Sequence, residues 1–121
     1  IFRKEQWQQT LYFSQKEIDT FKLKPELFAI LDIMRKIANT PFVITSGYRT
    51  IQENIKAGGV ANSAHLRGMA VDLLCVDDLK RTQMLKGILN CGTPVFLEIA
   101  KKHLHIGIES SLGRTILSED N

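Results

Sequence analysis

The amino-acid sequence predicts an α+β fold with a small, mainly antiparallel sheet flanked by helices. Apolar residues recur at helical spacing in two long segments, whereas shorter apolar and β-branched runs lie between and after these segments. The last two of the shorter runs are separated by only a few residues, which indicates a β-hairpin and therefore antiparallel pairing. We therefore expect helices packed against a sheet of short strands.

The length and composition are those of one small domain. With 121 residues and 44% hydrophobic side chains, the chain can bury a core, and we expect a single domain over residues 1–121. Its core is expected at about residues 23–109, and the polar tail 110–121 is expected to fray. No apolar run approaches the roughly 20 residues that span a bilayer. The net charge is +3, but the basic residues are scattered, so we do not expect binding to nucleic acid. We expect the chain to be a monomer.

The two cysteines, Cys75 and Cys91, have neither metal-binding spacing nor the density of a disulfide framework. Buried free thiols are the default expectation, and a single disulfide remains the alternative for an exported protein. The N-terminal segment has no signal-peptide pattern, so the sequence leaves localisation open.

The N-terminal half contains two helix signals. Ser14 and Glu17 form a capping box that predicts a short helix through Thr20. Pro25 suits the first position of a longer helix, which must end before Pro41 because the residue preceding proline is pushed out of the helical region. The apolar face of this helix comprises Leu27, Ile30, Leu31, Met34 and Ile37.

A short β-branched run at residues 42–45 predicts a buried strand. Thr50 and Glu53 form a second capping box, which starts a short helix. Gly58-Gly59 ends that helix because glycine readily takes the left-handed conformation at a helix end. Residues 60–67 are expected to form a loop.

The segment at 69–76 alternates and predicts a strand that buries Val71, Leu73 and Cys75. A helix capped by Asp77 or Asp78 is expected to run to Asn90. Two further strands, 95–99 and 103–108, are then separated by residues 100–102, which indicates a hairpin.

Asp72 lies in the middle of the strand at 69–76, where a carboxylate is costly unless it is paired or coordinated. Taken alone, Asp72 has an ordinary interpretation as a hydrogen-bond acceptor, and His65 has one as a loop residue. The C-terminal hairpin adds a second group, because His103 and His105 are two apart on a strand and must face the same side. Imidazole and carboxylate together are typical zinc ligands.

A site of His65, Asp72 and one of the two strand histidines would leave a fourth metal position open, as in catalytic zinc sites. If Glu98 pairs with His103 or His105, it joins their face and could act as a general base. Other registers would place Glu98 on the reverse side of the sheet.

Arg49 follows the strand at 42–45, in a loop that a buried strand presents rigidly. A fixed guanidinium beside a metal could bind a substrate carboxylate or stabilise a developing oxyanion. A surface salt bridge is the alternative interpretation.

Three motifs occur in order along the chain: SGYRT, GGVANSAHLRGMAVD and LEIAKKHLHIGIE. Together they resemble the family of zinc D-Ala-D-Ala carboxypeptidases and L-alanyl-D-glutamate endopeptidases, which have the hedgehog/DD-peptidase fold. The family pattern S-x-H-x-x-G-x-A-x-D is filled at every position, by Ser63, His65, Gly68, Ala70 and Asp72. Asn54 and Gly58-Gly59 are also characteristic, and the resemblance covers residues from about 23 to 109.

The resemblance implies one bound Zn²⁺, with His65, Asp72 and His105 as its ligands. It also implies roles for the surrounding residues: Glu98 as the catalytic base, Arg49 as the substrate-carbonyl or oxyanion group, and Ser63, Tyr48 and His103 at the substrate. One position departs from the pattern. Many members place the base three residues before the last histidine, where this chain has Lys102.

The function implied is hydrolysis of peptidoglycan stem peptides, with a D-Ala-D-Ala carboxypeptidase as the first expectation. A phage-lysin-type endopeptidase that cuts L-Ala-D-Glu or a cross-bridge is an alternative. A non-catalytic, zinc-stabilised binding module is another, which Lys102 favours. Action on the cell wall would make the protein exported, periplasmic or phage-released.

Overall fold

The structure, a computed structural model, describes residues 12–59, 63–108 and 113–118. The helices are α2 (Gln15–Phe21), α3 (Pro25–Ala38), α4 (Ile51–Lys56) and α5 (Asp78–Leu89), with a short 3-10 helix, η1 (Ala64–Arg67). The strands are β1 (Ile44–Ser46), β2 (Ala70–Leu74), β3 (Phe96–Ile99), β4 (His103–Gly107) and β5 (Arg114–Leu117). The predicted α+β class is confirmed.

The strands form one sheet in the order β1-β2-β4-β3-β5. The pairs β1/β2, β2/β4 and β3/β4 are antiparallel, as the hairpin signal predicted, whereas β3 and β5 are parallel. The sheet is therefore mixed rather than purely antiparallel.

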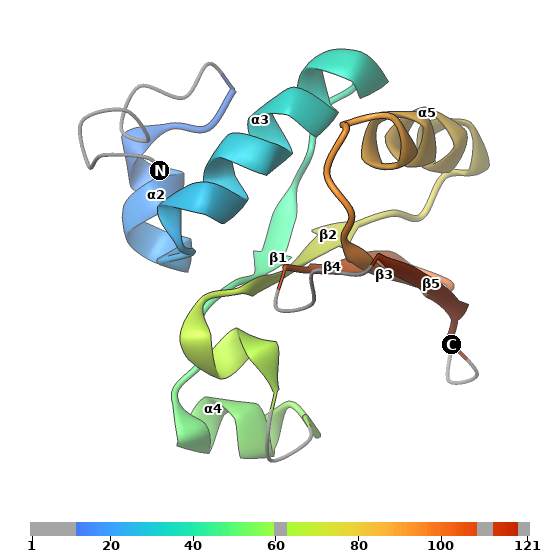
Figure 1. The fold of residues 1–121 in the computed structure, drawn as a ribbon. Coiled ribbons are helices and arrows are strands. Elements are labelled where there is room, and N and C mark those ends of the chain that lie inside the picture. Colours follow the sequence, from blue (N-terminus) through green and yellow to red (C-terminus); the bar gives the residue numbers. More distant parts are fainter. Residues whose placement is uncertain (1–11, 60–62, 109–112, 119–121) are drawn as a thin grey trace.

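Helices α3 and α5 cover one face of the sheet, whereas η1 and α4 lie on the opposite side, near the β1–β2 end (Figure 1). The core lies between the sheet and the two covering helices. Its fully buried members include Leu27, Phe28, Leu31 and Met34 of α3, Met84 of α5, and Val71, Leu73, Leu97, Leu104 and Ile106 of the strands. Because side chains alternate along a strand, the residues between these strand positions face the other side.

Local signals set the helix starts as predicted. In α2, the Ser14 hydroxyl accepts a hydrogen bond from the Glu17 amide at 3.2 Å, and the Glu17 carboxylate accepts one from the Ser14 amide at 2.9 Å. The same reciprocal pair joins Thr50 and Glu53 at the start of α4. Asp77, rather than the residue after it, caps α5. Each cap satisfies backbone amides that have no partner within the helix.

The tail was predicted wrongly in part, because residues 114–117 form β5. The Arg114 amide donates to the carbonyl of Val95 at 3.0 Å, and the Ser118 amide donates to Ile99 at 2.9 Å. An edge strand is held by backbone hydrogen bonds and can carry polar side chains, so low hydrophobicity does not reveal it. Residues 110–112 and 119–121 lie outside the described part.

Three boundaries also differ from the predictions. The core begins before residue 23, since Phe13 and Ile18 are buried in it. The first strand lies at Ile44–Ser46 rather than 42–45, and the expected loop at 60–67 ends in η1. Both cysteines are free thiols as expected, but only Cys75 is buried, whereas Cys91 is partly exposed. No helix in the described ranges is long and apolar enough to span a membrane.

Candidate metal centre

The strand register aligns three predicted site residues across the sheet. Asp72 of β2 lies opposite His105 of β4, and His105 lies opposite Glu98 of β3. Residues directly opposite each other share a face, so these three side chains project from the side of the sheet that α3 and α5 do not cover. The conditional prediction that Glu98 joins the face of His105 is confirmed. The same row continues to Ile116 of β5.

His65, Asp72 and His105 form a compact group whose potential ligand atoms all lie within 4.8 Å of one another. Asp72 Oδ1 lies 2.8 Å from His105 Nδ1 and 3.5 Å from His65 Nε2. Two of these residues come from paired strands, and the third comes from η1. The fold therefore brings together residues that are up to 40 positions apart in the chain.

The ring orientation of His65 follows from its hydrogen bond. His65 is 2% exposed, and its Nδ1 lies 2.7 Å from the backbone carbonyl oxygen of Gly47. A carbonyl can only accept, so Nδ1 carries a proton, and in the neutral ring the lone pair then lies on Nε2, the nitrogen that faces Asp72. A backbone carbonyl on the outer ring nitrogen is a common partner of a metal-binding histidine, because it fixes the tautomer and the ring orientation.

The donor set fits a divalent metal. A lone pair on His65 Nε2 that faces a carboxylate oxygen is unfavourable unless a proton or a cation lies between them. In tetrahedral zinc sites the bond lengths place neighbouring ligand atoms about 3.4 Å apart. The separation of His65 Nε2 from Asp72 Oδ1, 3.5 Å, matches this value, whereas that of His105 Nδ1, 2.8 Å, is a direct hydrogen-bond distance. Two imidazoles and one carboxylate suit zinc and leave one coordination position for a further ligand.

Asp72 is held in its ionised form. Burial of the carboxyl group raises its pKa, but the hydrogen bonds and charges of His105 and His65 outweigh that effect and hold the pKa well below its usual range. The carboxylate is therefore available as a metal ligand at neutral pH.

Arg49 contacts the other oxygen of the same carboxylate. Its Nη2 lies 3.3 Å from Asp72 Oδ2, its Nε donates to Ser46 Oγ at 3.1 Å, and its Nη1 donates to Asn54 Oδ1 at 3.3 Å. The Arg49 backbone amide also donates to the His65 carbonyl at 3.0 Å. The side chain is 17% exposed, so this ion pair belongs to the site and is not a surface salt bridge.

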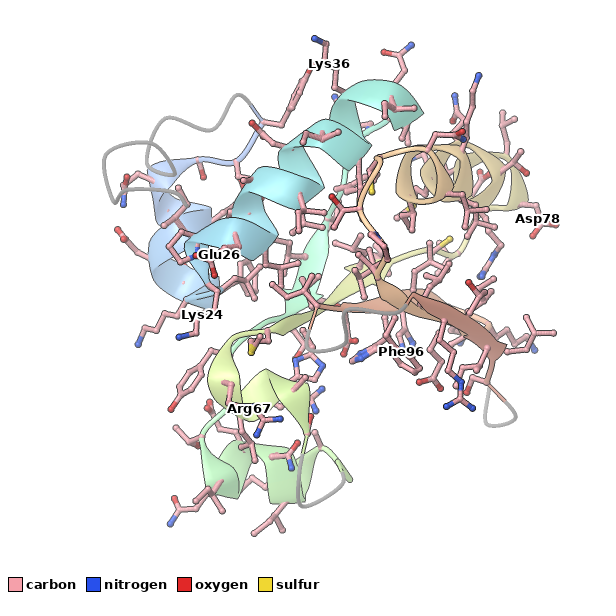
Figure 2. The ribbon with its side chains drawn as sticks, in the orientation of Figure 1. Lys24, Glu26, Lys36, Arg67, Asp78 and Phe96 are labelled. Atoms are coloured by element: carbon pink, nitrogen blue, oxygen red, sulfur yellow. The ribbon has the colours of Figure 1, made fainter. Side chains whose placement is uncertain are left out.

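Two predicted groups lie beside the three-residue cluster rather than in it. Glu98 flanks His105 on β3, and His103 is two residues before His105 on the same face of β4, opposite Leu74. The ring of Phe96 meets the ring of His105 edge-on, with 5.7 Å between centroids. Phe96 lies on the side of the sheet away from α3 and α5 (Figure 2).

The predicted substrate-binding residues occupy different places. The hydroxyl of Ser63 accepts a hydrogen bond from the His65 amide at 3.2 Å and so caps η1. Tyr48 is 42% exposed and borders a hollow of about 250 Å³, which Arg49 also lines. Lys102 is an exposed residue of the β3–β4 turn, and its carbonyl accepts from the Cys75 amide at 2.9 Å.

Sequence reasoning assigned no role to Gly47, Ser46 or Asn54. The carbonyl of Gly47 orients His65, whereas Ser46 and Asn54 hold Arg49. The available signal was that all three lie in or just after the SGYRT motif. Gly47 contacts a residue 18 positions away, and Ser46 and Asn54 reach Arg49 from opposite sides of it in the chain, so no local pattern indicated which partner each would contact.

Comparisons with known proteins agree with this geometry. The sequence matches the family model described as Peptidase M15 over residues 1–107. The fold is similar to the crystal structure of the L-Ala D-Glu endopeptidase ChiX of Serratia marcescens, with a TM-score of 0.54 and 19% sequence identity. That similarity covers 83% of this chain and 91% of the other. A search of curated proteins gives no significant match. At this identity the structural likeness establishes the fold.

Proposed function

We propose that this chain, which belongs to the peptidase M15 family, is a zinc peptidase that hydrolyses the stem peptides of peptidoglycan. The observation that carries the proposal is the convergence of His65 Nε2, Asp72 Oδ1 and His105 Nδ1, which fits a metal with an open position. Zinc held there would polarise the carbonyl of the scissile peptide bond and make water a better nucleophile.

The residues around the metal centre would divide the remaining work. Glu98, on the face of His105, would take a proton from the attacking water and return it to the leaving amine. Arg49 has guanidinium N–H groups beyond the three that its neighbours use, and these could stabilise the developing oxyanion. Ser63, Tyr48 and His103 would contact the substrate, with His103 as the second candidate for proton transfer.

The proposal is tested by digesting purified peptidoglycan with the metal-free protein, with and without added Zn²⁺, and identifying the products by mass spectrometry. Zinc-dependent release of stem-peptide fragments is the expected result. A protein that binds zinc but releases no fragment from several wall chemotypes would instead be the non-catalytic binding module that Lys102 favours.

The bond that is cut is proposed to be D-Ala-D-Ala, as the sequence motifs imply. An internal bond such as L-Ala-D-Glu is the second candidate. It is favoured by the row of Asp72, His105 and Glu98, which continues along the sheet to Ile116 and could accommodate a chain that extends past the metal. Defined muropeptides separate the two, because only the carboxypeptidase releases free D-Ala from an intact pentapeptide.

This function requires access to the cell wall. We therefore propose that the protein acts in the periplasm, outside the cell or after release by a phage, and that it does so as a monomer. Size-exclusion chromatography with light scattering tests the oligomeric state.

A further inference from the structure

We propose that Asn54 is a positioning residue of the metal centre, which acts through Arg49 to orient the carboxylate of Asp72. The proposal rests on the assignment of Asp72 as a metal ligand. The link from Asn54 to the three-residue cluster runs through the Arg49 guanidinium, which contacts Asn54 Oδ1 on one side and Asp72 Oδ2 on the other.

Asn54 is a buried polar side chain in an otherwise exposed helix. It is 3% exposed, whereas its neighbour Ile55 is 69% exposed and Ile51, one turn earlier, is 71% exposed. A buried amide is costly unless its polar atoms have partners. The Oδ1 of Asn54 has such a partner in Nη1 of Arg49, at 3.3 Å. In α4, the side chain that faces the interior is therefore the polar Asn54 and not one of the two isoleucines.

The backbone leaves room for this side chain at Gly59. The Gly59 amide donates to the Asn54 carbonyl at 2.9 Å, and a Cβ at Gly59 would overlap Asn54 Oδ1. Any side chain at Gly59 would therefore displace the atom that Arg49 contacts. This steric requirement accounts for the second glycine of the Gly58-Gly59 pair, which a helix end alone does not demand.

Arg49 is fixed from three elements at once. Ser46 lies at the end of β1, Asn54 on α4 and Asp72 on β2, and each accepts from a different nitrogen of the guanidinium group. An arginine side chain samples many rotamers when it is free, so two neutral anchors hold it in the orientation that contacts Asp72.

As a consequence, the two carboxylate oxygens of Asp72 have different partners. Oδ2 is engaged by Arg49, and Oδ1 faces His105 and His65. A carboxylate held in this way would present one oxygen to the metal. Partners outside the ligand set commonly change metal affinity 10- to 100-fold when they are removed, because they preorganise the ligands. Asn54 contacts Arg49, which in turn contacts the proposed ligand Asp72, so Asn54 would act on the metal site indirectly.

Two substitutions of similar size separate positioning from simple packing. Asn54→Asp keeps an oxygen acceptor for Arg49, whereas Asn54→Leu keeps the volume and removes the acceptor. Ile55→Ala, at the exposed neighbouring position, is the matched control. Zn²⁺ affinity is measured by competition with a chromophoric chelator, and folding is followed by circular dichroism and thermal unfolding.

We expect Asn54→Leu to weaken Zn²⁺ binding roughly 10-fold or more, and Asn54→Asp and Ile55→Ala to bind like the wild type. Wild-type affinity in folded Asn54→Leu would overturn the proposal. Loss of affinity in folded Asn54→Asp would overturn it too, and that variant decides the matter if Asn54→Leu does not fold.

A second readout needs no metal or activity. The Arg49 Nε–H resonance in ¹H–¹⁵N spectra of the metal-free protein reports whether the guanidinium is held. It should broaden or move toward a free-arginine shift in Asn54→Leu and stay near its wild-type position in Asn54→Asp. An unchanged resonance in folded Asn54→Leu would contradict the proposal. This result is independent of the proposed function, which fails separately if the wild type neither binds zinc nor cuts peptidoglycan.

Discussion

Glu98 lies directly opposite His105 in the antiparallel ladder of β3 and β4, so the two side chains project from the same face of the sheet. One strand further, Asp72 lies opposite His105 in turn. A carboxylate that flanks the proposed metal ligands without belonging to them is well placed to move a proton. The first prediction follows from this relationship.

Replacement of Glu98 by Gln should leave zinc binding unchanged and lower hydrolysis by a factor of about 100 or more, because the amide cannot accept the proton of the attacking water. Metal content by elemental analysis and kcat on a defined muropeptide check both parts. The matched variant is His103→Gln, at the other candidate position on this face. If His103→Gln abolishes hydrolysis while Glu98→Gln retains it, His103 is the base instead.

His65→Ala should reduce the bound zinc well below one ion per chain. The substitution removes a proposed ligand whose ring is oriented by the Gly47 carbonyl, and the two proposed ligands that remain would hold zinc poorly. Equilibrium dialysis followed by elemental analysis measures the stoichiometry, and Lys102→Ala, at an exposed turn position, is the control. Full stoichiometry in His65→Ala would remove His65 from the ligand set.

Zinc should stabilise the fold when it is added to metal-free protein. A ligand that binds only the folded state adds about 2.7 kcal/mol to the free energy of unfolding at 100 times its dissociation constant. Thermal unfolding in chelator and in excess Zn²⁺ measures the difference as a rise in Tm. His65→Ala and Asp72→Asn should show little of this rise, and an equal rise in those variants would mean that zinc binds elsewhere.

The stability of the metal-free protein should depend on pH through the ionisation of Asp72. The pKa of Asp72 is lowered in the folded state, so its ionised form stabilises the fold at pH values above the ordinary aspartate pKa of 3.8. That contribution is lost as the pH falls below this value, because the unfolded chain takes up the proton first.

At pH 7 we therefore expect Asp72→Asn to lower the free energy of unfolding by about 1.5–3 kcal/mol, the range for hydrogen bonds to charged groups. The difference from the wild type should narrow as the pH falls from 4 toward 2. Urea unfolding in the presence of a chelator gives both values. A difference that is constant over this range would show that the ionisation of Asp72 does not contribute to stability.

Local patterns in the sequence were sufficient for most of the fold. Both capping boxes form as predicted, because Ser14 and Thr50 reach amides only three residues away. The hairpin of β3 and β4 also forms as predicted. By contrast, β5 was missed, since a polar edge strand owes its structure to backbone pairing with β3, which no local pattern records.

The sequence by itself determined which residues could make a metal site. The resemblance of three motifs to a known zinc peptidase family singled out His65, Asp72 and His105, whereas residue types and spacing alone left His103 and His105 as equal candidates. The sequence also determined that His103 and His105 share a face, since alternation along a strand is a local property.

Only the tertiary structure decided how those residues meet. The β2–β4 register places Asp72 opposite His105, the β3–β4 register places Glu98 on the same face, and η1 brings His65 Nε2 to within 3.5 Å of Asp72. It also decided that Asn54 lies behind Arg49. Strand register and helix placement depend on contacts between residues that are distant in the chain, and one shift in register would move every side chain of a strand to the opposite face.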